Sequence, residues 1–538
     1  MTATNPSDAW GTVPRMLRAQ AEAAPDAVVI VDRDITLTTA ELRERAARLG
    51  RALIASGVEP GDRVALWAPN TWEWAVAAFA TWEVGGVLVP LSTRFKAYEA
   101  GDMLARMGVT TLVAAEGFLG TSYVGMLAEK FGPSADVPFK GLPSLRTVVV
   151  LGPTDIPGVR SMSDFLTLAD EVSPVALEER ALSVPPDAYL DILSTSGTTG
   201  APKGVMLDHA QILRAYWDWS EIADLRRGDH YPVVSPLAHG FGIHAGLLAC
   251  VMRLAVMIPI QVFDPDRALE LVDAQKVNFM AGPPTLFSRL LANPTLAEHD
   301  ISSLRVAIVG AASVPEELVS KMLTRLGIAR VVNAYGLIEG TVVSMTRAGD
   351  PVGVVASTAG SAVPGMEIRI VDPEGRSVPA GVRGEIQLRG YGVMRGYWDA
   401  PETTAQTLVD GWLRTGDVGV LDAAGNLSIV GRLKEMFIVG GFNTYPAEVE
   451  NLLLRHPDVA QVAVVPIPHD ELGEVGCAFV VPQAGRDVAP AELVAWARSN
   501  MSNYKVPRSV VIVPNLPTNV NGKVDRTHLR QAALDTLP

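Results

Sequence analysis

Hydrophobic residues in the first ninety positions recur with two different spacings. Thr38 and Glu41 have the spacing of a capping box, and apolar residues follow at every third or fourth position, which predicts a helix. The mainly apolar stretches at 62–67 and 87–91 predict buried strands, and residues 71–84 between them predict a second helix. Strands that alternate with helices favour a mostly parallel sheet with helices on its faces.

The alternation continues to about residue 360, and a different pattern follows. Further buried strands are predicted at 145–151, 189–193, 256–259, 279–282, 306–309 and 331–334. Short strands between Gly- and Asp-rich turns at 360–431 predict a small antiparallel β-barrel or another β-rich subdomain. Residues 435–538 alternate between helices and strands on their own, as a small α+β domain does. We therefore expect an α/β protein with a large N-terminal domain at 1–431, a junction at 432–434 and a C-terminal domain at 435–538.

Length, charge and cysteine content narrow the class of protein. The chain has 538 residues, and 48% of them are hydrophobic. This length exceeds that of a single domain with one hydrophobic core, so we expect two or more domains. Its formal net charge of −14 disfavours sequence-independent binding to nucleic acid. Cys250 and Cys477 lie in apolar segments, as reduced cysteines of a cytoplasmic protein do. We expect no signal peptide, and no membrane span at 244–263, because Arg253 and Pro259 interrupt that apolar stretch.

One stretch, residues 193–204, concentrates groups that bind phosphate. It reads Leu-Ser-Thr-Ser-Gly-Thr-Thr-Gly-Ala-Pro-Lys-Gly and directly follows a predicted strand. Hydroxyls, flexible glycines and a lysine form an anion-binding loop, and α/β sheets place such loops at strand ends. The spacing differs from that of the Walker loop. We therefore predict that the following residues bind phosphate groups: Thr195, Ser196, Gly197, Thr198, Thr199, Gly200 and Lys203.

This stretch resembles the signature loop of the adenylate-forming superfamily, which includes acyl-CoA synthetases, luciferases and the adenylation domains of peptide synthetases. In that superfamily the loop holds the β- and γ-phosphates of ATP. The resemblance extends over essentially the whole chain and implies ATP, Mg²⁺ and CoA as cofactors or cosubstrates. Further motifs follow in the expected order at 235–244, 309–315, 333–339, 415–417, 431–436, 440–448 and 519–525.

The resemblance also implies roles for individual residues. Lys523 is expected to promote adenylation, and Glu339, with Thr198, to hold Mg²⁺. Lys434 would be the hinge about which the C-terminal domain rotates. Further nucleotide contacts are expected at Gly310, Ala311, Ala312, Asn333, Ala334, Tyr335, Gly336, Ile338, Asp417, Ile429 and Arg432. The acid pocket is expected at Trp217, His239, Phe241, Gly242, Gly310, Gly336 and Leu337, and the CoA tunnel at Gly440, Gly441 and Phe442.

One position departs from the family pattern. Ile338 stands where the motif Tyr-Gly-x-Thr-Glu has threonine. The lost hydroxyl hydrogen bond is worth about 0.5–1.5 kcal/mol, or up to about 3 kcal/mol to a charged group. We therefore expect Ile338 to slow adenylation without abolishing it. Lineage variation and an introduced change are equally compatible with this residue.

Three functions fit these motifs: an acyl-CoA ligase, an adenylating enzyme that loads a carrier protein, and a catalytically weakened homologue. Residues 440–450 resemble CoA ligases of the fatty-acid type, and a luciferase is disfavoured. The retained Lys203, Glu339 and Lys523 argue against an inactive protein.

The substrate class follows from a narrower resemblance. Residues 67–74 and 282–287 resemble bacterial catabolic acyl-CoA ligases, a group that includes the ligase for the propanoate side chain of a steroid-derived indanedione. Apolar and aromatic pocket walls favour a hydrophobic monocarboxylic acid, such as a medium-chain fatty acid or a steroid-derived alicyclic acid. The exact acid and the oligomeric state stay open, and a homodimer is one candidate.

Overall fold

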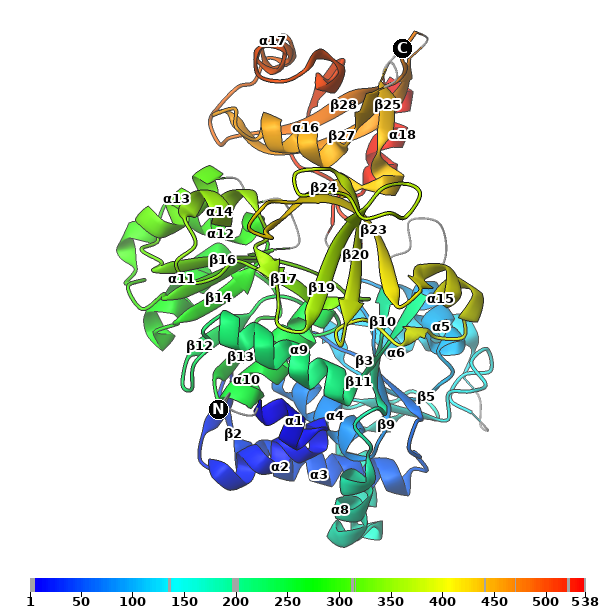
Figure 1. Cartoon of the computed structure of the whole chain (residues 1–538). Coiled ribbons are helices and arrows are strands. Elements are labelled where there is room, and N and C mark those ends of the chain that lie inside the picture. Colours follow the sequence, from blue (N-terminus) through cyan, green and yellow to red (C-terminus); the bar gives the residue numbers. More distant parts are fainter. Residues whose placement is uncertain are drawn as a thin grey trace.

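The computed structural model describes residues 5–133, 137–195, 203–310, 314, 316–439, 442–469, 471–519 and 523–536. Figure 1 shows a large body, coloured blue to yellow, and a smaller orange and red unit that sits on top of it. The predicted α/β class is confirmed, because parallel strand pairs recur in sheets that helices cover. Among the described residues no helix is both long enough and apolar enough to cross a bilayer.

An eight-stranded sheet forms the centre of the large body. Its core is a run of parallel strands, and two antiparallel strands extend it at one edge. In spatial order the strands are β21 (Gly396–Tyr397), β11 (Lys203–Asp208), β10 (Tyr189–Thr195), β4 (Val87–Pro90), β3 (Arg63–Trp67), β5 (Val109–Ala114), β8 (Thr147–Val150) and β9 (Arg160–Ser161).

Two further sheets of the body carry parallel strands beside this one. The first has the order β12 (His230–Val233), β13 (Val256–Pro259), β1 (Val28–Asp32) and β2 (Ile35–Thr38). The second has the order β14 (Phe279–Gly282), β15 (Val306–Gly310), β16 (Arg330–Leu337), β17 (Thr341–Met345) and β18 (Ser361–Ala362). A small hairpin pairs β6 (Glu116–Phe118) with β7 (Thr121–Ser122).

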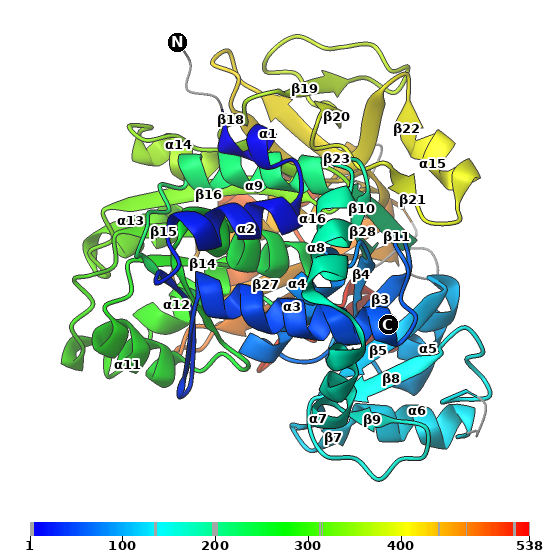
Figure 2. The same cartoon turned by 90° about the horizontal axis from the view of Figure 1, so that it is seen from below.

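Helices cover the faces of these sheets, as Figure 2 shows from below. The predicted capping box is present at the start of α3, where the Thr38 hydroxyl accepts from Glu41 N and the Glu41 carboxylate accepts from Thr38 N. The body helices are α1 (Pro6–Trp10), α2 (Val13–Ala23), α3 (Thr39–Ala55), α4 (Trp72–Glu83), α5 (Ala97–Arg106), α6 (Tyr123–Phe131), α7 (Met162–Phe165), α8 (Pro174–Ser183), α9 (His209–Ile222), α10 (Ala249–Arg253), α11 (Pro265–Gln275), α12 (Pro284–Leu291), α13 (Glu316–Thr324), α14 (Val352–Ser357) and α15 (Pro401–Thr407).

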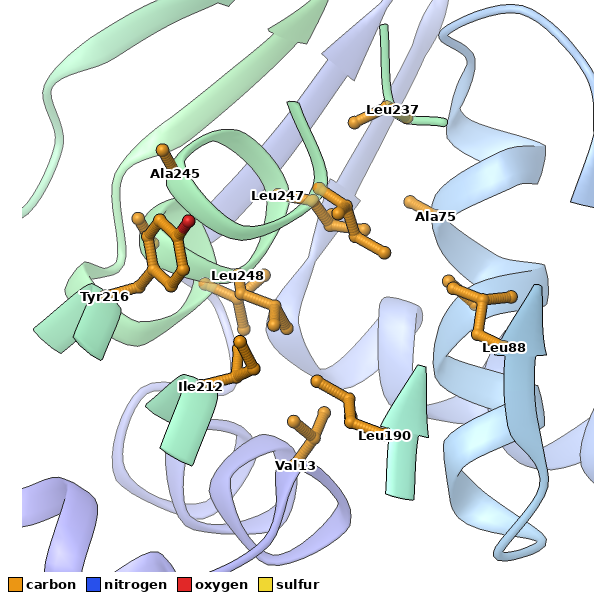
Figure 3. Close-up of a cluster of buried hydrophobic side chains, with 14 of the residues drawn as sticks. Val13, Ala75, Leu88, Leu190, Ile212, Tyr216, Leu237, Ala245, Leu247 and Leu248 are labelled. Atoms are coloured by element: carbon orange, nitrogen blue, oxygen red, sulfur yellow. The ribbon is translucent and has the colours of Figure 1, made fainter. Parts of the chain in front are cut away.

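The hydrophobic core joins segments that lie far apart in the sequence. Figure 3 shows side chains from two N-terminal helices, two strands of the central sheet, α9 and the π-helix η2 (Phe241–Leu248) in one cluster. Burial of this apolar surface is the main force that holds these elements together. The cluster includes Val13, Ala75, Leu88, Leu190, Ile212, Leu247 and Leu248, all fully buried.

The β-rich part agrees with the predicted β-rich subdomain. Its strands pair antiparallel throughout, as expected, in the order β19, β20, β23 and β22, and β24 also pairs with β23. Among the described residues these pairings make one five-stranded sheet. The strands are β19 (Met366–Val371), β20 (Gly384–Gly390), β23 (Trp412–Leu421), β22 (Leu408–Val409) and β24 (Leu427–Arg432).

The upper unit in Figure 1 has its own sheet and its own hydrophobic core. The long hairpin of β27 and β28 forms its centre, and three helices pack around the sheet. The elements are β25 (Phe437–Val439), β26 (Phe442–Thr444), α16 (Pro446–Leu453), β27 (Val459–His469), β28 (Gly473–Pro482), α17 (Pro490–Asn500), β29 (Ser509–Ile512) and α18 (Arg526–Thr536).

Candidate active site

The predicted phosphate loop connects two antiparallel strands of the central sheet. Thr195, the last residue of β10, pairs with Lys203, the first residue of β11. The two ends of the loop are thus held side by side by the sheet. Ser196, Gly197, Thr198, Thr199 and Gly200 lie outside the described residues.

The next part of the candidate site is the carboxyl end of β15 and β16. Gly310 pairs with Ala334, and a β-carbon at Gly310 would lie 2.9 Å from the Ala334 carbonyl oxygen. A β-carbon at Gly336 would lie 2.3 Å from the Thr341 carbonyl oxygen. Both glycines are therefore required by close backbone approach at this sheet edge. Ala311 and Ala312 lie outside the described residues.

Asp417, on β23, lies at the centre of a polar cluster that joins β16 to β24. Its carboxylate accepts a 2.5 Å hydrogen bond from the Tyr335 hydroxyl and lies 3.0 Å from Arg432 Nε. The register of β23 and β24 pairs Asp417 directly with Arg432. Burial and then the Asp417 charge raise the pKa of Tyr335 far above its usual range, so the tyrosine is a neutral donor. The structure thus brings three predicted nucleotide contacts together.

Tyr397 links two other predicted residues and was missed by the sequence analysis. Its hydroxyl donates to Glu339 Oε1 over 3.1 Å, and the Lys203 ammonium lies 5.0 Å from the centre of its ring. Its side chain is mostly buried. Tyr397 reaches this position because β21 adds to the edge of the central sheet beside β11.

The wall of the predicted acid pocket begins at His239. Its Nδ1 accepts a 3.3 Å hydrogen bond from Phe241 N, at the start of η2. Burial, followed by the charges of Lys523 and His244, lowers the pKa of His239 to about 4, so the imidazole is neutral at pH 7. Gly242 is buried in η2, where a β-carbon would lie 2.1 Å from the Pro236 carbonyl oxygen.

Helix α9 presents two tryptophans to opposite sides. Trp219 is buried with its ring 6.0 Å from that of Phe241, so it supports the pocket wall. Trp217 packs edge-on against Trp10 and under the Arg253 guanidinium, 3.6 Å from its ring centre. Positions two residues apart point in nearly opposite directions on a helix. The structure therefore does not bring Trp217 to Phe241.

A buried pair lies behind this wall. His244 Nε2, on η2, is 2.7 Å from Asp191 Oδ2, on β10. Both side chains are almost completely buried, and Asp191 Oδ1 has no hydrogen-bond partner among the described residues. The pair joins the strand that leads into the phosphate loop to the helix that carries the pocket wall.

Lys523 belongs to a hairpin of the upper unit that reaches toward the body. Its backbone pairs with that of Asn519, and an isolated bridge joins Thr518 to Val524. Although Lys523 remains open to solvent, the surrounding protein and then the Arg432 charge lower the pKa of its ammonium, while Asp417 opposes this effect. The charge of Lys523 thus acts on the cluster of predicted site residues.

The remaining predicted residues take varied positions. The Asn333 amide donates to two backbone carbonyls at the end of α14, those of Val355 and Thr358. Lys434 lies in a short 3-10 turn, Leu433–Glu435, between the body and the upper unit. Leu337 and Ile338 pack against the main core at the end of β16, and Ile429 is at the surface of β24. Gly440 and Gly441, and the side chain of Phe442, lie outside the described residues.

Glu339 is the carboxylate that the site offers to a metal ion, and its Oε1 already accepts from the Tyr397 hydroxyl. No group of three or more His, Cys, Asp or Glu side chains that could hold a metal ion occurs in the described part of the chain. A single carboxylate near the predicted phosphate loop fits Mg²⁺, which proteins bind through one or two carboxylates together with substrate phosphates.

The chain is similar to known proteins over nearly its whole length. The family model described as AMP-binding enzyme matches residues 17–398, and the model of the AMP-binding enzyme C-terminal domain matches residues 448–523. The chain is 42% identical over 521 residues to 3-[(3aS,4S,7aS)-7a-methyl-1,5-dioxo-octahydro-1H-inden-4-yl]propanoyl:CoA ligase from Rhodococcus jostii, covering 97% of this chain and 98% of the relative. A ligase of the same name from Mycobacterium tuberculosis is also 42% identical, over 523 residues and the same shares. The solved structure of the anthranilate CoA ligase AuaEII with anthranoyl-AMP is 25% identical and matches with a TM-score of 0.83, covering 97% of each chain.

Proposed function

The chain belongs to the family of AMP-binding enzymes and is an ATP-dependent acyl-CoA ligase. From this premise we propose that its acid substrate is a hydrophobic monocarboxylate, and that the preferred acid is a bicyclic propanoate with ring ketones. The observation that carries this substrate is the 42% identity, over 97% of the chain, to the ligase named for such a propanoate. ATP and CoA are its cosubstrates.

The pocket chemistry supports a monocarboxylic acid. Phe241 and Leu337 offer apolar surface, and His239 is neutral at pH 7, so it supplies no cation for a second carboxylate. We assign the pocket to His239, Phe241, Gly242, Gly310, Gly336 and Leu337, and leave Trp217 out because its ring is covered by Trp10 and Arg253.

The nucleotide is held by the cluster around Asp417. This carboxylate accepts from the ribose hydroxyls, since its two oxygens offer more acceptor sites than Tyr335 and Arg432 occupy. Thr195, Lys203 and the residues between them bind the β- and γ-phosphates. Mg²⁺, when bound by Glu339 and the phosphates, neutralises charge on the phosphoryl oxygens.

The two half-reactions use different parts of the upper unit. In the first, the acid carboxylate attacks the α-phosphorus, the bond to the β-phosphate bridging oxygen breaks, and pyrophosphate leaves. Lys523 stabilises the negative charge that develops between the carboxylate and the α-phosphate. In the second, the CoA thiolate attacks the acyl carbon and AMP leaves. We propose that rotation at 432–434 exchanges Lys523 for the segment at Gly440 and Gly441 between these steps.

The test is release of AMP and pyrophosphate from a panel of acids, each with and without CoA. We expect kcat/KM to be highest for the bicyclic dioxo propanoate, with octanoate and an aryl acid as comparison arms. We expect both the formation of acyl-CoA and repeated turnover of the enzyme to require CoA. A preference for octanoate would overturn the proposed substrate, and pyrophosphate release without CoA-driven turnover would indicate a carrier protein as acceptor.

Lys523→Ala tests the assigned residue, and Lys276→Ala, which removes a surface lysine paired with Asp273 and Asp300, is the matched control. The first variant should lose adenylation and keep thioester formation from supplied acyl-AMP, and the control should keep both. Equal loss of both half-reactions would refute the proposed exchange of Lys523 for the segment at Gly440 and Gly441.

The buried free cysteines Cys250 and Cys477 support a cytoplasmic location. A homodimer stays a prediction that size-exclusion chromatography tests.

A further inference from the structure

Arg94 makes a contact that none of the assignments above explains. It lies in the body, on the loop between β4 and α5, and its Nη1 donates a 3.1 Å hydrogen bond to the backbone carbonyl oxygen of Asn519. Asn519 belongs to the upper unit, 425 positions further along the chain. A guanidinium donor makes this a charge-assisted hydrogen bond, which is stronger than one between neutral groups.

The accepting carbonyl is at the base of the hairpin that carries Lys523. Asn519 N donates to the Lys523 carbonyl oxygen over 2.7 Å, and Lys523 N donates to Asn519 Oδ1 over 3.1 Å. These two bonds fix the backbone of Lys523 relative to that of Asn519. A group that holds the Asn519 carbonyl therefore also fixes where the Lys523 side chain starts.

The loop that presents Arg94 is itself held by buried aromatic side chains. Trp67 Nε1 donates to the Ser92 carbonyl oxygen over 2.9 Å, and the Tyr123 hydroxyl donates to the Thr93 carbonyl oxygen over 3.2 Å. The Trp67 and Tyr123 rings are both buried and stack with their centres 4.6 Å apart. Arg94 is thus a solvent-exposed side chain on an anchored backbone.

From this geometry we propose that Arg94 is a positioning residue for adenylation, which holds the Lys523 hairpin against the body while the acyl-adenylate forms. The inference rests on the proposed role of Lys523. The contact joins the body to the unit that rotates, so it must break when the domain turns for thioester formation. Arg94 therefore acts in one of the two orientations and not as a permanent part of the fold.

The experiment is acid-dependent ATP–pyrophosphate exchange without CoA, which reports adenylation alone. Arg94→Ala should lower kcat by about 3- to 10-fold, as expected for one exposed hydrogen bond from a charged group, with less change in the KM for ATP. Arg94→Lys, which keeps a donor and the charge, should recover part of this loss. Arg146→Ala is the matched control, because Arg146 is an exposed arginine of the body that pairs with Asp62 over 3.0 Å.

A double variant separates positioning from general damage. If Arg94 acts through Lys523, adding Arg94→Ala to Lys523→Ala causes no further loss of exchange. An equal further loss in that background, or full activity of Arg94→Ala alone, overturns the inference. Full activity of Lys523→Ala overturns the role of Lys523 and the inference with it, whereas a slow Lys523→Ala beside a normal Arg94→Ala overturns only the inference.

Discussion

The buried Asp191–His244 pair gives a prediction that can be worked from the structure in some detail. His244→Phe leaves the Asp191 carboxylate buried without a hydrogen-bond partner at either oxygen among the described residues. Removing one partner of a buried pair so that a carboxylate stays buried without a partner costs about 3–5 kcal/mol of the free energy of unfolding. Asp191→Leu leaves a buried imidazole nitrogen unpaired, which costs about 1–3 kcal/mol.

The double variant Asp191→Leu/His244→Phe should be far more stable than the sum of the two losses. It replaces both polar groups by apolar groups of similar size, and such replacements of buried pairs are often neutral. We expect a loss of under about 1 kcal/mol, and therefore a coupling energy of at least about 3 kcal/mol between the two positions.

Urea unfolding followed by tryptophan fluorescence measures these losses. Nine of the ten tryptophans precede residue 432 and only Trp496 follows it, so the signal reports mainly the body that contains the pair. Additive losses within about 0.5 kcal/mol would show that the two side chains stabilise the body independently, and would refute the reasoning.

Two further predictions concern the chemistry. Ile338→Thr restores the hydroxyl of the family pattern and should raise acid-dependent pyrophosphate release by up to about one to two decades; no gain would mean that the hydroxyl is not used here. Tyr397→Phe removes the donor to Glu339 and should weaken Mg²⁺-ATP binding in calorimetry by about 2- to 10-fold. Tyr391→Phe, which removes a 2.8 Å hydrogen bond to Asp218 on α9, is its control, and equal weakening by both variants would contradict a specific role of Tyr397.

Local signals in the sequence predict much of this fold. The Thr38 capping box, the strands of the central sheet and the change of pattern near residue 360 all depend on residues close together in the chain. The predicted strand at 331–334 is longer in the structure, since β16 continues through Tyr335 to Leu337. The pairing of β21 with β11 could not be predicted, because it joins strands far apart in the sequence and no local pattern specifies it.

The same limit applies to the candidate site. Trp217 and Trp219 both lie on a helix that is apolar on more than one side, so spacing alone does not indicate which ring faces Phe241. Tyr397 carries no local signal of its own, because its position depends on a strand pairing with Val205, nearly two hundred residues earlier. The role proposed for Arg94 likewise depends on its hydrogen bond to Asn519, a contact between distant residues that the sequence does not indicate.

The pairing of β21 with β11 has a consequence for recombination between relatives. This two-residue strand returns from the β-rich part of the chain to the edge of the central sheet, with Gly396 opposite Met206 and Tyr397 opposite Val205. Gly396 has a φ of +144°, and a β-carbon there would lie 2.9 Å from Thr404 Cγ2, so the position requires glycine. A chimera that exchanges the intervening segment must rebuild this register, because a slip of one residue turns Tyr397 to the other face of the sheet, away from Glu339.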